Sequence, residues 1–205
     1  MSRTRTRVVV MALLSGALAV SGGCRRGQQP QGSDTVKPSY NKDTGRLERI
    51  TYDRNKDGKP DAWLFMDGTR AVLAELDENY DGVVDRREYY VEQPASTTPA
   101  PAGKTLPPRH LLTRAEQATR GDGKINRWET YQQGLLVHVE EDTNGDGRVD
   151  KWETWSQGVL QLVELDTKGT GRPNRRLVYP PDGSAPRLEV DEHDDGTFSP
   201  TTPTP

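Results

Sequence analysis

Apolar and polar residues alternate along much of the chain in short runs. The residues one and three places before a recurring acidic segment are apolar, and the residue between them is usually glutamate. This holds for Ala74-Glu75-Leu76, Val163-Glu164-Leu165 and Leu188-Glu189-Val190. A period of two is typical of a strand with one buried face. We therefore predict a strand leading into each acidic segment.

The acidic segment has the form Asp-x-Asn-x-Asp-Gly and recurs at a regular spacing. Its six copies begin 24, 41, 24, 24 and 25 residues apart, at Asp53, Asp77, Ala118, Asp142, Asp166 and Asp191. The one long interval holds the proline-rich stretch 94–108, which we predict to be a surface insertion. Regular spacing of this kind indicates a tandem repeat of about 24 residues.

The segment after each loop is open to two interpretations. Trp128 and Tyr131, like Trp152 and Trp155, lie three residues apart and could share one face of a helix. However, a repeat of about 24 residues cannot hold a long loop and two ordinary helices. We therefore predict a mainly β fold, with tandem β-hairpin repeats of about 24 residues forming an antiparallel meander. Tight glycine turns alternate in it with the acidic loops, and both chain ends are disordered.

The N-terminus has the features of an export signal. Arg3, Arg5 and Arg7 precede an apolar run of 13 residues, Val8–Val20. Cys24, the only cysteine, follows and resembles the lipidated cysteine of bacterial lipoproteins, with ordinary signal-peptidase cleavage as the alternative. We predict a signal peptide at 1–23, a lipidated flexible tether at 24–39, a repeat domain at 40–198 and a disordered tail at 199–205.

This resemblance implies a lipid-anchored protein of the cell envelope that faces the periplasm or the exterior. By analogy with lipoprotein sorting, Arg25 favours the outer membrane over the inner one. Without the signal, the 28 basic residues fall by three to 25 against 31 acidic ones, a net charge of −6. Such a charge argues against nucleic acid as a partner. With 31% hydrophobic and 29% charged residues, the chain should need stabilisation beyond its core.

The acidic loops supply the oxygen ligands that calcium prefers. Calcium takes six to eight oxygens, so carboxylates at alternate positions of a tight glycine turn suit it. The predicted ligands are Asp53, Asn55, Asp57 and Asp61 in the first loop; Asp77, Asn79, Asp81, Asp85 and Glu88 in the second; and Asp142, Asn144, Asp146, Asp150 and Glu153 in the fourth. The first loop has Leu64 at position 12, so Asp61 or water would close its shell.

Three alternatives stay open for these loops. Asp, Asn and Gly also make good turns without any metal. Glu129 persists in the ligand-poor third copy, so a glutamate at position 12 could instead pair with a neighbouring strand. Arg120 and Lys168 stand at ligand position 3 of the third and fifth copies, where a built-in cation could replace the missing ion.

The loops resemble those of EF-hand, dockerin and FG-GAP-type calcium proteins over about nine residues of each repeat, which implies calcium as the ligand. EF-hands and dockerins imply flanking helices, whereas strand-flanked calcium loops agree with the alternation above. Tyr40, Gly45, Arg46 and Leu47 also resemble the hairpin units of bacterial YD-type repeats.

The chain shows no nucleophile elbow and no phosphate-binding loop. We therefore expect a non-enzymatic envelope scaffold with structural calcium, anchored to the membrane by lipid. Another envelope protein or a polysaccharide is the expected partner. The first alternative is an adhesion or glycan-binding module that uses repeated aromatic residues such as Trp63, Trp128 and Trp152. An envelope hydrolase is a more remote alternative.

Overall fold

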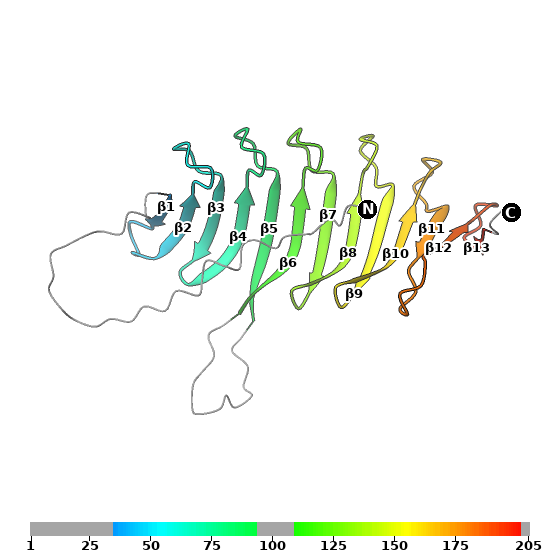
Figure 1. Cartoon of the computed structure of the whole chain (residues 1–205). Helices are drawn as coiled ribbons and strands as arrows, with labels where there is room; N and C mark the ends of the chain where they lie inside the picture. Colours follow the sequence, from blue (N-terminus) through cyan, green and yellow to red (C-terminus); the bar gives the residue numbers. More distant parts are fainter. Residues whose placement is uncertain (1–34, 94–108, 202–205) are drawn as a thin grey trace, which may run out of the picture. The chain divides into compact units, whose positions relative to one another are not determined.

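A computed structural model describes residues 35–93 and 109–201, all within one unit that spans Gly32–Pro205. These residues form one sheet of 13 strands whose spatial order follows the sequence, with every neighbouring pair antiparallel (Figure 1). The strands are β1 Val36–Tyr40, β2 Leu47–Tyr52, β3 Ala62–Asp67, β4 Arg70–Leu76, β5 Arg86–Gln93, β6 Arg109–Gln117, β7 Arg127–Gln132, β8 Leu135–Glu141, β9 Lys151–Ser156, β10 Val159–Leu165, β11 Arg175–Val178, β12 Arg187–Val190 and β13 Ser199–Pro200. The predicted antiparallel meander is confirmed.

The connections differ at the two edges of the sheet. All six acidic loops lie at one edge, which we call the loop edge; the first five are at the top of Figure 1, and the sixth is at the right-hand end beside β13. Short turns lie at the other edge, including Gln133-Gly134 and Gln157-Gly158, where both residues have positive φ. Two consecutive residues of this conformation match the right-handed twist of antiparallel strands. The predicted alternation of tight turns with acidic loops is confirmed for these repeats, whereas the connections 41–46 and 179–186 are longer.

The sheet extends beyond both predicted limits of the repeat domain. Strand β1 begins at Val36, inside the predicted tether, and β13 adds Ser199 and Pro200, at the start of the predicted disordered tail. All side chains of these two edge strands are exposed, so no buried alternation marks them in the sequence. The predicted signal peptide, Cys24, the proline-rich insertion and residues 202–205 lie outside the described residues. The described residues, 35–93 and 109–201, contain no helix long and apolar enough to cross a membrane.

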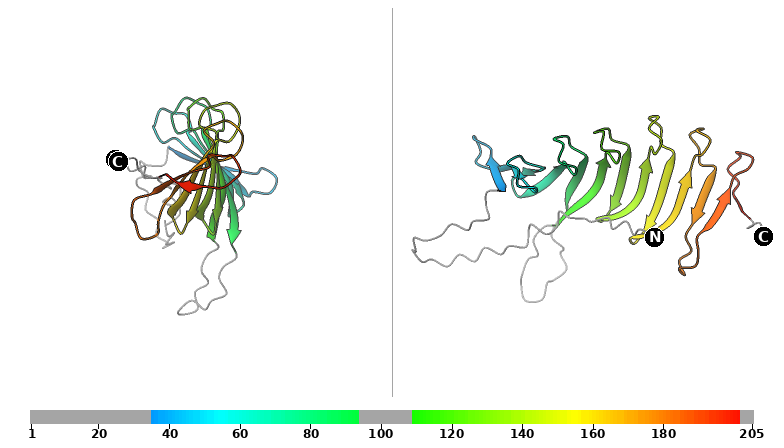
Figure 2. Two further views of the ribbon diagram at one scale, coloured as in Figure 1. Left: turned by 90° about the vertical axis from the view of Figure 1, so that its right-hand side faces the viewer. Right: turned by 45° about the horizontal axis from the view of Figure 1, so that its top comes forward.

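The two faces of the sheet carry different side chains. The face that we call the ladder face holds Glu88, Ala115, Glu129, Val139 and Glu153, which are paired in turn across five neighbouring strands. Ala115 and Val139 are each 0% exposed there, because long side chains from the odd-numbered strands close over them. This is how a single sheet without a covering layer among the described residues buries a core (Figure 2).

The opposite face, which we call the tryptophan face, holds Trp63, Trp128 and Trp152. Their register is continuous, since Glu140 pairs with both Trp128 and Trp152. Successive residues of a strand point to opposite faces, so aromatic residues three apart are separated. Tyr131 accordingly lies on the ladder face, where its hydroxyl donates to Glu129, while Trp128 lies on the other. The strand conformation thus excludes the helical interpretation of these pairs.

Candidate metal centre

Five of the six acidic loops fold around the aspartate at their first position, and the third loop begins with Ala118. In the first loop, Asp53 accepts hydrogen bonds from the backbone amides of Lys56 at 2.6 Å and Gly58 at 2.9 Å. Asp61, at position 9, accepts from the amides of Arg54 at 2.6 Å and Asn55 at 3.1 Å. These bonds hold the loop backbone in a tight turn, as short polar side chains commonly do.

The turn requires left-handed backbone at two positions. Gly58, at position 6, has φ 93°, and Lys56, at position 4, has φ 64°. The sign is the same at positions 4 and 6 of all six loops. Glycine takes this conformation without strain, which explains why position 6 is glycine in every copy, including those that lack ligands.

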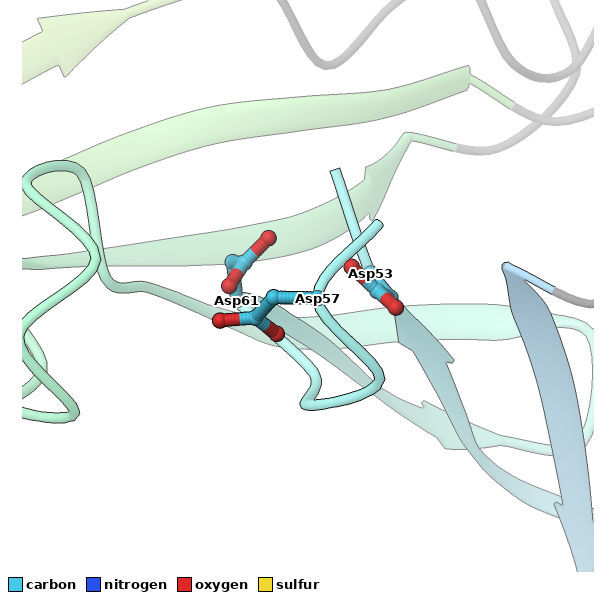
Figure 3. Close-up of side chains that lie close together, drawn as sticks. All are labelled: Asp53, Asp57 and Asp61. Carbon is cyan, nitrogen blue, oxygen red and sulfur yellow. The ribbon is translucent and has the colours of Figure 1, made fainter. Parts of the chain in front are cut away.

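The first loop brings three carboxylates together. One oxygen from each of Asp53, Asp57 and Asp61 lies within 4.8 Å of the other two, so this group could hold a metal ion. Figure 3 shows the three side chains arriving from the two ends of the loop and from its middle. Asn55, the fourth predicted ligand, lies beside them, with its Nδ2 at 3.3 Å from Asp57.

The other two loops with a full predicted set share the backbone pattern. Asp77 accepts from Gly82 at 2.8 Å, and Asp142 accepts from Gly147 at 2.9 Å. Asn79 lies between Asp81 and Asp85, and Asn144 accepts from the amide of Asp146. Within residues 35–93 and 109–201, however, only the first loop gathers three acidic oxygens as closely. Asp150 closes the fourth loop, where it accepts from the amide of Thr143.

Glu88 and Glu153 do not lie in the loops. Both are on strands, β5 and β9, where their side chains accept hydrogen bonds from Tyr90 and Trp155 respectively. A strand advances about 3.3 Å per residue, so three residues carry position 12 about 10 Å past position 9, whereas a helix would turn back. Their predicted role as ligands stays untested, and this geometry does not favour it.

Position 12 instead belongs to an ion-pair network on the ladder face. Arg86 donates to Glu88 at 2.9 Å and reaches past β6 to Glu129 at 2.8 Å. Arg127 binds Glu129 at 2.9 Å and lies 3.7 Å from Glu153. The sequence raised the alternative that Glu129 pairs with a neighbouring strand; its partners instead lie on its own strand β7 and on β5, the next strand but one.

The network sets the ionisation of its members. Burial opposes ionisation of Glu129, but the charges and hydrogen bonds of Arg86 and Arg127 hold its pKa below the ordinary value. Burial and the neighbouring Glu129 raise the pKa of Tyr131, so its hydroxyl stays a donor. The sequence signal for this network is basic-x-Glu-x-aromatic, found at 86–90, 127–131 and 151–155, and the loop-centred interpretation missed it.

The comparisons with known proteins add no name to this geometry. No family model, curated protein or solved structure matches the chain.

Proposed function

We propose that the acidic loops bind calcium as a structural ion. The convergence of Asp53, Asp57 and Asp61 within 4.8 Å carries this proposal, because three hard oxygen donors on one tight turn suit calcium better than a softer metal. Asn55 completes the proposed set in the first loop. The corresponding sets are Asp77, Asn79, Asp81 and Asp85 in the second loop and Asp142, Asn144, Asp146 and Asp150 in the fourth.

In this proposal the protein is a non-enzymatic scaffold tethered in the cell envelope through Cys24. Extracellular calcium modules bind at about 10⁻⁴ to 10⁻³ M, which suits structural stabilisation better than sensing. The repeat supports this role because the loop carboxylates are crowded along one edge of a sheet. Neutralising that charge would stabilise the array.

A conservative substitution at position 9 separates calcium binding from loop folding. The third and fifth loops already use Asn126 and Asn174 there, and each side-chain oxygen accepts the same backbone amide that an aspartate accepts elsewhere. We therefore expect Asp61→Asn to keep the fold and to weaken calcium binding by the first loop. Asp122→Asn in the ligand-poor third loop is the matched control.

The measurement is a calorimetric calcium titration, together with melting in calcium and in chelator. We expect the wild-type protein to bind calcium and to melt higher in its presence, by mass action. Asp61→Asn should lose part of both effects, and Asp122→Asn should lose neither. Equal melting of the wild-type protein in calcium and chelator would refute structural calcium.

A second candidate function is polysaccharide binding by the tryptophan face. Trp128 and Trp152 are half-buried on alternate strands, about 10 Å apart at the usual strand spacing. Exposed Thr130 and Thr154 lie on the same face. Quenching of tryptophan fluorescence by a soluble polysaccharide, lost in Trp128→Ala and kept in the ladder-face variant Trp155→Ala, would support it. Absence of quenching would exclude it for that polysaccharide.

A further inference from the structure

Consecutive acidic loops are joined directly along the loop edge. The amide that opens one loop donates to the carbonyl that closes the preceding loop, as in Asp77 to Asp61 and Asp142 to Asn126, both at 2.8 Å. The same bond joins every consecutive pair from the first loop to the sixth. A long side chain at the tip of one loop can therefore reach the next.

Position 3 makes this contact in the two loops where it is basic. Arg120, in the third loop, places Nη1 at 3.1 Å from the carbonyl oxygen of Asp142 and at 3.9 Å from its Oδ1. Lys168, in the fifth loop, places Nζ at 2.7 and 2.8 Å from the two carboxylate oxygens of Asp194 in the sixth. Both cations thus serve the following loop, not their own, which corrects our expectation from the sequence.

Arg120 lies directly against the turn of the fourth loop. A Cβ atom added at Gly145 would be 3.0 Å from Nη1 of Arg120. Asp142 is 4% exposed and accepts backbone amides from Gly145 and Gly147, so the guanidinium is the one charged donor found near it among the described residues.

Among the three loops with a full predicted ligand set, the first and second lack such a neighbour. Position 3 of the first loop is the neutral Asn55, so it brings no charge to the second loop. The second loop has Asn79 in the same place, and its Nδ2 lies 3.6 Å from the Cβ position of Gly121 in the third. The side chain at position 3 therefore lies close to the following loop whether it is basic or neutral, and only its charge differs.

We propose that a basic residue at position 3 supplies a fixed cation to the following loop, so that Arg120 makes the fourth loop independent of calcium. This inference rests on the calcium binding proposed above and narrows it to the first and second loops. A guanidinium beside Asp142 repels a divalent ion and already meets the electrostatic need that the ion would meet.

Arg120→Asn tests this proposal, since asparagine is the residue that the repeat itself uses at position 3 of the first, second and fourth loops. The control is Arg148→Asn, which removes the same charge from an exposed position of the fourth loop itself. Calcium titration should show two sites in the wild-type protein and in the control. Arg120→Asn should add a third site, or tighten binding to the fourth loop at least about tenfold. Adding Asp142→Asn should abolish the gain.

A second measurement does not depend on calcium binding. In chelator, Arg120→Asn should melt below Arg148→Asn because Asp142 loses its counter-charge, and calcium should restore the difference. Calcium binding in the wild-type protein that is unchanged by Arg120→Asn would overturn the fixed-cation inference alone. Absence of binding in both proteins would overturn the proposed function, and equal melting of the two variants in chelator would then also overturn the role of Arg120.

Discussion

The loop edge and the ladder face both concentrate carboxylates, but they neutralise them differently. At the loop edge, Asp53 and Asp77 accept backbone amides, which satisfy their hydrogen bonds and leave a full negative charge. On the ladder face, Glu129 faces two guanidinium groups, Arg86 and Arg127. Hydrogen bonding and charge neutralisation are therefore separate requirements for a buried carboxylate. The strands meet both within the fold, whereas the aspartates of the first and second loops form no ion pair within the part of the chain that the structure describes.

The largest effect is expected where the ladder loses its central carboxylate. Glu129 is 3% exposed, so Glu129→Leu leaves two partly buried guanidinium groups short of a partner. Removing one member of a buried ion pair costs about 3–5 kcal/mol. We expect about 3 kcal/mol, the lower end, because Arg86 keeps Glu88 and Arg127 keeps Glu141. Denaturant unfolding with and without calcium measures the loss, which should be equal in both.

The control for this variant is Glu140→Leu, on the tryptophan face. The side chain of Glu140 is 47% exposed, so its replacement should change stability by no more than about 0.5 kcal/mol. A loss from Glu129→Leu no larger than the loss from this control would show that the ladder contributes little. A loss that calcium reversed would erase the distinction between the two regions.

Acid should separate the two regions by the pH at which each loses stability. The folded pKa of Glu129 lies below its ordinary value of 4.5, since Arg86 and Arg127 outweigh the effect of burial. Its contribution is therefore complete above about pH 4.5 and is lost as the pH falls through the lower folded pKa. Asp142 behaves likewise from its ordinary value of 3.8, through the Gly145 and Gly147 amides and Arg120.

Urea unfolding at a series of pH values, with and without calcium, measures this acid loss. Glu129→Gln should flatten the fall that begins near pH 4.5, because the group that takes up the proton is gone. Since the proposed calcium sites are the first and second loops, calcium should leave the acid dependence from Glu129 and from Asp142 unchanged. If calcium changed only the acid dependence that Glu129→Gln removes, the assignment of that dependence to the ladder face would be wrong.

The fold followed from local signals in the sequence. Alternation such as Ala74-Glu75-Leu76 and the even spacing of the loops decided both the strands and the meander, since a repeat pairs only with its neighbours. The sequence pattern did not predict strands β1 and β13, because exposed edge strands need no apolar face. The length of the period, not the aromatic pattern, correctly separated strand from helix after each loop.

Only part of the candidate site could be predicted from the sequence. The ligand spacing gave Asp53, Asp57 and Asp61 because all three lie within nine residues of one loop. The partners of Glu129 and Asp142 could not be read locally, since Arg86 is 43 residues away and Arg120 is 22 residues away. Which side chain crosses to which repeat depends on strand register, which the repeat pattern alone does not specify.

The smallest expected effect concerns the loop edge alone and is a gain. Lys56 holds a left-handed φ of 64°, whereas the third, fourth and fifth loops place glycine at this position. The left-handed conformation costs a residue with a side chain about 1–2 kcal/mol, and glycine gives back about 0.5–1 kcal/mol through its greater freedom in the unfolded chain.

Lys56→Gly should therefore stabilise the protein by up to about 1 kcal/mol, measured by denaturant unfolding in chelator. Lys59→Gly is the control, because it removes the same charge from the same loop at a residue without positive φ. That control should be neutral or destabilising, since it adds backbone freedom and relieves no strain. If both variants lost stability equally, position 4 would not be strained in the folded protein. The loop edge would then depend on its carboxylates alone, and its contrast with the ladder face would become sharper.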